Sequence, residues 1–222
     1  MVTWAWFAII VSLYSAVLTD QNFFRGGGEI QSLLGWLLAI SMAATAAGSF
    51  KRERESGVLE LLLVSPLTTR QIIGGRLRGL WGQFAPAAVT FLVVWSYLIG
   101  LYSQYTYVTW FTNQPGELQQ VCFFAASFVV IPVIGLYFSL SCRHYITALL
   151  LTLGFTFVLP ALAFVLVRFA WWLILNKAVP FEWEEALLRY VWLIQLFCAS
   201  GFLARLHRNL ERRSFAIERS LS

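Results

Sequence analysis

Long runs of apolar residues, separated by short polar segments, dominate the chain. A helix that crosses the hydrocarbon core of a bilayer needs about 20 apolar residues, and six runs reach or nearly reach that length. None alternates with the period of two that marks barrel strands, and in lipid so long a backbone satisfies its own hydrogen bonds as a helix. The pattern predicts an all-α, polytopic membrane protein with about six transmembrane helices in a single domain, residues 1–222. The runs cover residues 1–18, 30–50, 80–102, 118–140, 145–167 and 186–203, and a tail follows at 204–222.

Three of the predicted helices contain an internal proline, at Pro86, Pro132 and Pro160. A proline lacks the N–H that would bond the carbonyl four residues earlier, so we expect each of them to kink its helix. Such kinks are ordinary architecture in membrane helices. The sequence alone therefore assigns none of these prolines the role of a hinge.

The composition favours a membrane environment. Of the 222 residues, 59% are hydrophobic and 12% are charged, whereas soluble domains carry about a quarter charged residues. A soluble fold of this size could not bury so much apolar surface. The three cysteines, Cys122, Cys142 and Cys198, lack the paired spacing of a metal or redox site. We therefore expect no metal and no cofactor on this chain.

Lys and Arg in the connecting segments are distributed unevenly between the two sides of the predicted bundle. Cytoplasmic loops carry an excess of these residues, so the richer side should face the cytoplasm, with both termini. We expect the first run to be a span rather than a signal peptide, because no basic region precedes it and no cleavage site follows. The expected location is the plasma (inner) membrane. The richer side holds Lys51, Arg52, Arg54, Arg70, Arg76, Arg78, Arg143, Arg205, Arg208, Arg212, Arg213 and Arg219, and the other holds Arg25, Arg168, Lys177 and Arg189.

The cytoplasmic connection at residues 51–66 differs from the others. At helical spacing it is amphipathic: Glu53, Gly57 and Glu60 share one face, and valine and leucine side chains form a stripe on another. A short charged helix of this kind suits contact with a cytoplasmic partner. It suits equally well a helix that lies on the lipid surface.

The stretch from Glu53 to Leu67 reads ERESGVLELLLVSPL. It resembles a signature of the type-2 ABC exporter permeases, which runs roughly Glu, basic, Glu, any residue, Gly, Thr, Leu or Trp, Glu and two leucines, with Pro a few residues on. That family also has six spans with both termini inside, and its signature also lies between spans two and three. Val58 replaces the common Thr. The family usually has an amphipathic helix before the first span, so we expect either a natural start upstream of Met1 or a shortened form.

The resemblance implies a transmembrane subunit of an ATP-binding-cassette exporter, which forms the path for efflux. Its short coupling helix would insert into a groove on a separate cytoplasmic ATPase subunit. This chain has no Gly-x-x-x-x-Gly-Lys-Ser/Thr loop, so ATP is expected on that partner and the chain is not expected to be an enzyme. Further expected partners are a second permease copy or paralogue and the bilayer, with no nucleic acid. The matching positions are Glu53, Glu55, Gly57, Leu59, Glu60, Leu63 and Pro66.

Two other classes stay open from the residues alone. A secondary transporter or channel commonly carries buried carboxylates or broken helices at the midplane, whereas these runs hold weakly polar residues such as Gln83 and Gln195. A non-transporting membrane assembly component would share the apolar pattern. An intramembrane enzyme needs ionisable groups at depth, and His144 and His207 both fall in basic cytoplasmic segments. The transported substrate, and homodimer versus heterodimer, do not follow from the sequence.

Overall fold

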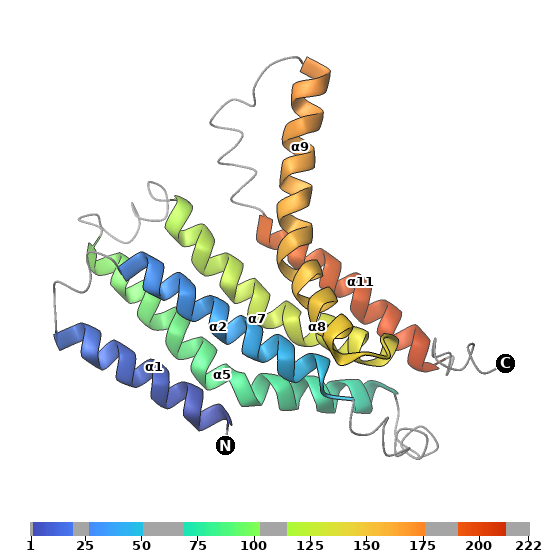
Figure 1. Cartoon of the computed structure of the whole chain (residues 1–222), viewed down its shortest axis with the longest axis horizontal. Helices are drawn as coiled ribbons and strands as arrows, with labels where there is room; N and C mark the ends of the chain where they lie inside the picture. The colour runs from blue at the N-terminus through green and yellow to red at the C-terminus, as the bar shows by residue number, and fades with distance from the viewer. Residues whose placement is uncertain (1, 20–26, 51–68, 103–114, 176–190, 212–222) are drawn as a thin grey trace.

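The computed structural model describes residues 2–19, 27–50, 69–102, 115–175 and 191–211. Within these ranges the regular structure is helical and contains no strand, which confirms the all-α prediction for this part of the chain. Figure 1 shows the arrangement. The elements are α1 (Val2–Thr19), α2 (Gly27–Ala47), α5 (Thr69–Tyr102), α7 (Pro115–Ser141), α8 (Tyr145–Leu153), the π-helical segment η2 (Gly154–Val158), α9 (Leu159–Leu175) and α11 (Val191–Glu211).

Three helical stretches of the described residues are long and apolar enough to cross a bilayer. They are Arg70–Tyr97, Gln119–Ser141 and Tyr145–Ile174, and Gln31–Ala47 is a shorter apolar helix. These stretches support the prediction of a membrane protein. The count of six spans stays a prediction.

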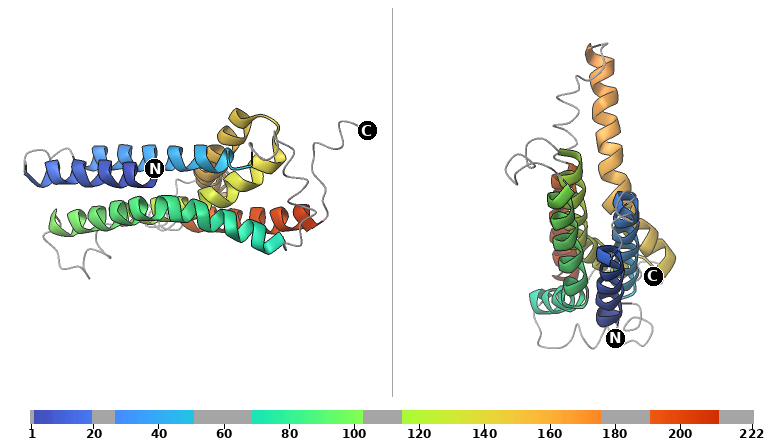
Figure 2. Two further views of the ribbon diagram at one scale, coloured as in Figure 1. Left: turned by 90° about the horizontal axis from the view of Figure 1, so that it is seen from below. Right: turned by 90° about the vertical axis from the view of Figure 1, so that its left-hand side faces the viewer.

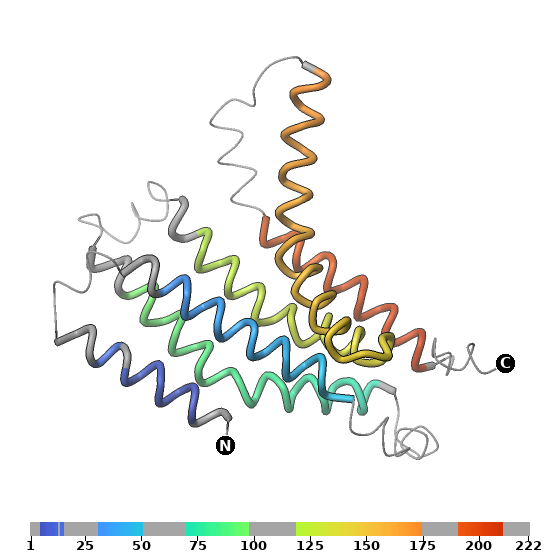
Figure 3. The backbone as a smooth tube through the Cα atoms, in the orientation of Figure 1, coloured from blue at the N-terminus to red at the C-terminus, as the bar shows by residue number. Residues whose placement is uncertain are grey.

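Helix α5 begins earlier than the hydrophobic pattern indicated. The apolar run was placed at residues 80–102, but the helix starts at Thr69 and contains 34 residues. At about 1.5 Å per residue it is roughly 51 Å long, which exceeds the ~30 Å hydrocarbon core. Hydropathy locates only the apolar part of a helix, and the first turns of α5 carry Arg70, Arg76 and Arg78. The helix bends along its length (Figure 3) and contains Pro86.

Helix α7 lies at the centre of the bundle, and α2, α5, α8 and α11 all pack against it. Within an apolar 18-residue part of this helix, 72% of the residues are buried. Helix α1 packs on α5, and the indole N–H of Trp6 donates to the Ser41 hydroxyl of α2 at 2.9 Å. Figure 2 shows α1 and α2 as one layer beside a second layer that contains α5. The bundle is thus organised around α7.

Small residues bring α2 and α7 close together. A Cβ built on Gly135 of α7 would stand 2.5 Å from the Cβ of Ala46, so no larger residue fits there without displacing a helix. Near the other end of the contact, a Cβ on Gly35 would stand 2.9 Å from the ring of Phe124. Membrane helices commonly associate through such small-residue contacts.

The elements α8, η2 and α9 follow one another as a continuous bent helix, and α9 leaves the bundle at a steep angle (Figure 1). Only 17% of this apolar stretch is buried. Large side chains such as Leu166 and Ile174 are 63% and 77% exposed. A surface of this kind is stable in lipid, because lipid tails are as apolar as these side chains and burial against another helix would bring no hydrophobic gain.

Candidate functional site

The predicted coupling residues lie outside the described part of the chain. Residues 51–68 contain all of them, so their contacts are not described: Glu53, Glu55, Gly57, Leu59, Glu60, Leu63 and Pro66. The structure does describe the two chain ends that carry this segment, at the end of α2 and the start of α5. These ends define the first part of the candidate site.

Phe50, directly before the segment, is only 2% exposed and is fixed from two sides. Its backbone N–H donates to the Ser139 hydroxyl of α7 at 3.1 Å. The guanidinium of Arg76, from α5, lies 5.1 Å from the centroid of the Phe50 ring. The same guanidinium lies 3.4 Å from the carbonyl oxygen of Ser49, to which it donates. The chain leaving α2 is therefore tied to both α5 and α7, and we call this group of four residues the anchor.

Tyr145 connects the anchor to the bent helix. It is the first residue of α8, and its hydroxyl donates to the Ala44 carbonyl in the last turn of α2 at 3.2 Å. A Cβ atom built on Gly48 would lie 3.4 Å from the Tyr145 ring. Because packed helices move as bodies rather than deforming continuously, a displacement of the chain at Phe50 would be passed to α5, α7 and α8 together.

Basic residues gather at this same end of the bundle. The start of α5, the junction of α7 and α8, and the end of α11 lie together in Figure 1. Arg168, by contrast, lies on α9, which points away from them. The uneven charge predicted from the sequence therefore corresponds to one end of the folded bundle. The described arginines there are Arg70, Arg76, Arg78, Arg143, Arg205 and Arg208.

A buried polar cluster joins α7, η2 and α11 within the bundle. The side-chain amide of Gln195 donates to the Thr156 carbonyl at 2.9 Å and to the Ser127 hydroxyl at 3.1 Å. All three residues are fully buried. In an α-helix the Thr156 carbonyl would accept from the N–H of residue 160, and Pro160 has none. Gln195 thus supplies a donor that the proline removes.

From the sequence, Gln195 was only a weakly polar residue within a span, and its contacts with Ser127 and Thr156 were not predicted. Gln195 and Ser127 are 68 residues apart, and no local pattern relates them. Pro160 was the available signal, because it leaves a carbonyl that some other donor must satisfy.

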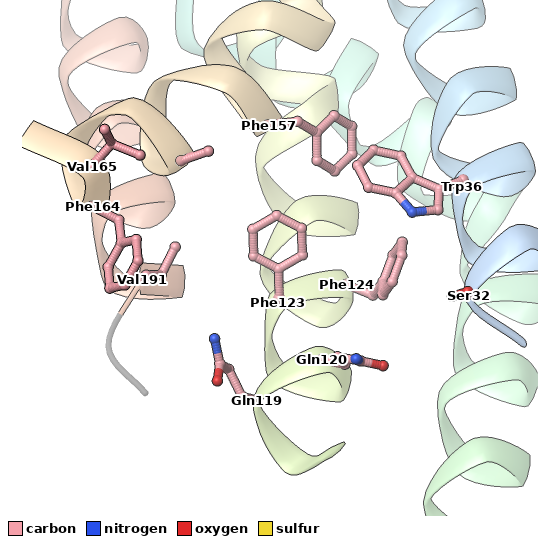
Figure 4. A pocket seen from close by; sticks show the side chains of 11 residues that line it. Ser32, Trp36, Gln119, Gln120, Phe123, Phe124, Phe157, Phe164, Val165 and Val191 are labelled. Atoms are coloured by element: carbon pink, nitrogen blue, oxygen red, sulfur yellow. The ribbon is translucent and has the colours of Figure 1, made fainter. Parts of the chain in front are cut away.

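A cavity of about 420 Å³ lies between α2, α7, η2, α9 and α11 (Figure 4). We call it the aromatic cavity, because rings from four elements line it. The cavity was not predicted from the sequence, because its lining comes from positions far apart in the chain, from Ser32 to Val191. The rings belong to Trp36, Phe123, Phe124, Phe157 and Phe164.

Within the described ranges, no three side chains of His, Cys, Asp or Glu come together as a metal ion would require. None of the described cysteines forms a disulfide. Comparison of the chain with protein-family models, with curated proteins and with solved structures found no significant match.

Proposed function

We propose that this chain is the transmembrane subunit of an ABC exporter and that residues 51–66 couple it to a separate cytoplasmic ATPase. The observation that carries the proposal is the Glu-Arg-Glu-Ser-Gly-Val-Leu-Glu sequence that starts at Glu53, between the second and third predicted spans. In the proposal, six spans line or support the path, and the basic end of the bundle and both termini face the cytoplasm. Two such subunits would form the complete path.

The anchor suits this role mechanically. A coupling segment transmits force only if its ends are held by the helices that must move. The backbone N–H of Phe50 is hydrogen-bonded to Ser139 of α7, and the Phe50 ring contacts Arg76 of α5. The segment therefore begins at a fixed point. A push on residues 51–66 would then tilt α2 and α5 rather than uncoil a loose connection.

The chemistry of the buried residues favours ATP-driven work over proton- or ion-coupled transport. In the described part of the chain, the buried polar side chains are all uncharged: Gln31, Ser127, Ser139, Thr152, Thr156 and Gln195. Transporters that use a proton or ion gradient commonly carry ionisable groups at membrane depth. The described residues thus offer no ionisable group for ion coupling, which favours energy supplied by a partner.

The proposal is tested by co-purification with the candidate ATPase in mild detergent. Gly57→Trp combined with Glu60→Lys should reduce the retained ATPase about tenfold or more, which corresponds to about 1.4 kcal/mol of binding free energy. The matched control is Gly26→Trp combined with Glu184→Lys, which makes the same chemical changes in two loops predicted on the opposite side. If the first variant inserts and elutes like wild type yet retains the ATPase fully, the coupling role is wrong.

A further inference from the structure

The aromatic cavity has the size and lining of a small-molecule site. Its volume of about 420 Å³ falls in the ~300–1,000 Å³ range of ligand pockets. Trp36 comes from α2, Phe123 and Phe124 from α7, Phe157 from η2 and Phe164 from α9. Figure 4 shows the rings of Trp36, Phe123 and Phe157 arranged around the space.

The rings hold one another in place. The Trp36 centroid lies 4.4 Å from that of Phe157 and 5.8 Å from that of Phe124, the latter in an edge-to-face arrangement. Phe123 and Phe157 are 5.8 Å apart. These separations are typical of favourable aromatic pairs. The wall is therefore formed before any ligand arrives, which lowers the entropic cost of binding.

One end of the cavity is polar but uncharged. Ser32, Gln119 and Gln120 line it, and Figure 4 shows both glutamines at the same end, away from Trp36 and Phe157. Among the described residues that line the cavity there is no Lys, Arg, His, Asp or Glu. Burying an ion without an opposite charge is costly, whereas amide and hydroxyl groups can bond a neutral polar group. The described part of the lining therefore fits an uncharged molecule with an apolar body and a hydrogen-bonding group at one end.

The cavity is accessible from the side of the bundle. Trp36 is 41% exposed, and Val165, which lines the wall contributed by α9, is 57% exposed. Because α9 diverges from the bundle (Figure 1), the surroundings of this wall include no second layer of described helices. In a bilayer those surroundings are lipid, so a molecule dissolved in the membrane can reach the site laterally.

We propose that the aromatic cavity binds an uncharged amphipathic small molecule, with an aromatic body and a hydrogen-bonding group, taken from the lipid phase. The inference goes beyond the proposed function, because binding requires neither the ATPase nor transport. The aromatic rings of the cavity contact the body of the ligand, and Gln119 and Gln120 form hydrogen bonds with its polar group.

Benzophenone is a suitable probe, since it has two aromatic rings, one carbonyl acceptor and no charge, and it forms covalent adducts on near-ultraviolet illumination. The purified full chain in lipid nanodiscs is illuminated with benzophenone, and the adducts are mapped by peptide mass spectrometry. We expect saturable adducts on the lining residues. Excess diphenyl sulfone, which is neutral and has no C–H that excited benzophenone readily abstracts, should reduce labelling about tenfold, whereas its charged carboxylate, 4-(phenylsulfonyl)benzoate, should not compete.

A matched pair of variants locates the site. Ala161→Trp fills the cavity, because Ala161 lines it. Ala170→Trp makes the same change nine residues further along α9, on the opposite face at about 100° per residue, at an exposed position. We expect Ala161→Trp to lose the saturable adduct and Ala170→Trp to retain it.

Two results would overturn the proposal. One is labelling of wild type that diphenyl sulfone does not reduce, because it indicates partition into lipid without a site. The other is equal competition by 4-(phenylsulfonyl)benzoate, which contradicts selection against charge. Both are read on the wild-type protein and so do not depend on the folding of a variant.

Discussion

The hydrogen bonds of Gln195 allow a quantitative test of how α11 is tied to the bent helix. Gln195→Leu removes the donor to the Thr156 carbonyl, at 2.9 Å, and to the Ser127 hydroxyl, at 3.1 Å. Side-chain hydrogen bonds between membrane helices average about 0.6 kcal/mol and reach about 1.7 kcal/mol. The side-chain amide oxygen of Gln195 is buried without a hydrogen-bond partner. Its removal therefore offsets part of the lost hydrogen-bond energy. We expect the unfolding free energy to fall by about 1 kcal/mol.

The cost of Gln195→Leu should depend on Pro160, because the proline is what leaves the Thr156 carbonyl without a backbone donor. In Pro160→Ala, the new N–H can donate to the Thr156 carbonyl, which then depends less on Gln195. Gln195→Leu should therefore cost about 0.6 kcal/mol less in the Pro160→Ala background than in wild type, which is the worth of one such bond. A double-mutant cycle isolates this coupling from other effects of the two changes.

The cycle is measured by unfolding the purified protein with SDS in mixed micelles, with tryptophan fluorescence as the signal and linear extrapolation of the free energy. Phe197→Leu is the control, because Phe197 is on the same helix and 80% exposed. It should neither destabilise the protein nor couple to Pro160→Ala. If Gln195→Leu and Pro160→Ala were strictly additive, the assignment of Gln195 as the substitute donor would be refuted.

Three further predictions concern packing, the anchor and orientation. Gly135→Val should lower the unfolding free energy by about 1–3 kcal/mol through overpacking. Gly201→Val should cost less, because a Cβ at Gly201 would meet no atom within 4 Å. Equal costs in the same SDS titration would contradict the close contact of Gly135 with α2. Arg76→Gln should cost about 0.5–1 kcal/mol by losing its ring contact, and an unchanged titration midpoint would exclude that contribution. In a cysteine-free background, Glu60→Cys should react with an impermeant maleimide only after cell lysis and Glu184→Cys in intact cells; the reverse pattern would invert the proposed topology.

The helices of this protein were largely predictable from sequence, because apolar runs of about 20 residues have few alternatives to a helix. The start of α5 was not indicated by hydropathy, since its first turns carry three arginines. The capping signal was nonetheless present: Pro66 and the two threonines after it mark a helix start, and α5 begins at Thr69.

The candidate sites were less predictable, because they depend on residues far apart in the chain. Phe50 and Ser139 are 89 positions apart, and Gln195 and Thr156 are 39 apart. Apolar runs specify which segments enter the membrane, but they carry little information about which faces meet, since lipid is as apolar as the helix surface. The coupling positions rest on the family resemblance and stay a prediction.

The most direct test of the central claim is a covalent capture from the coupling segment itself. A photoreactive benzoylphenylalanine is placed at Leu59 in living cells, with Glu184 as the control position. We expect a cross-linked product at Leu59 that contains an ATPase with a phosphate-binding loop, and no such product from Glu184. Efficient cross-linking at Leu59 to lipid or to other proteins alone, with the chain inserted normally, would contradict this expectation.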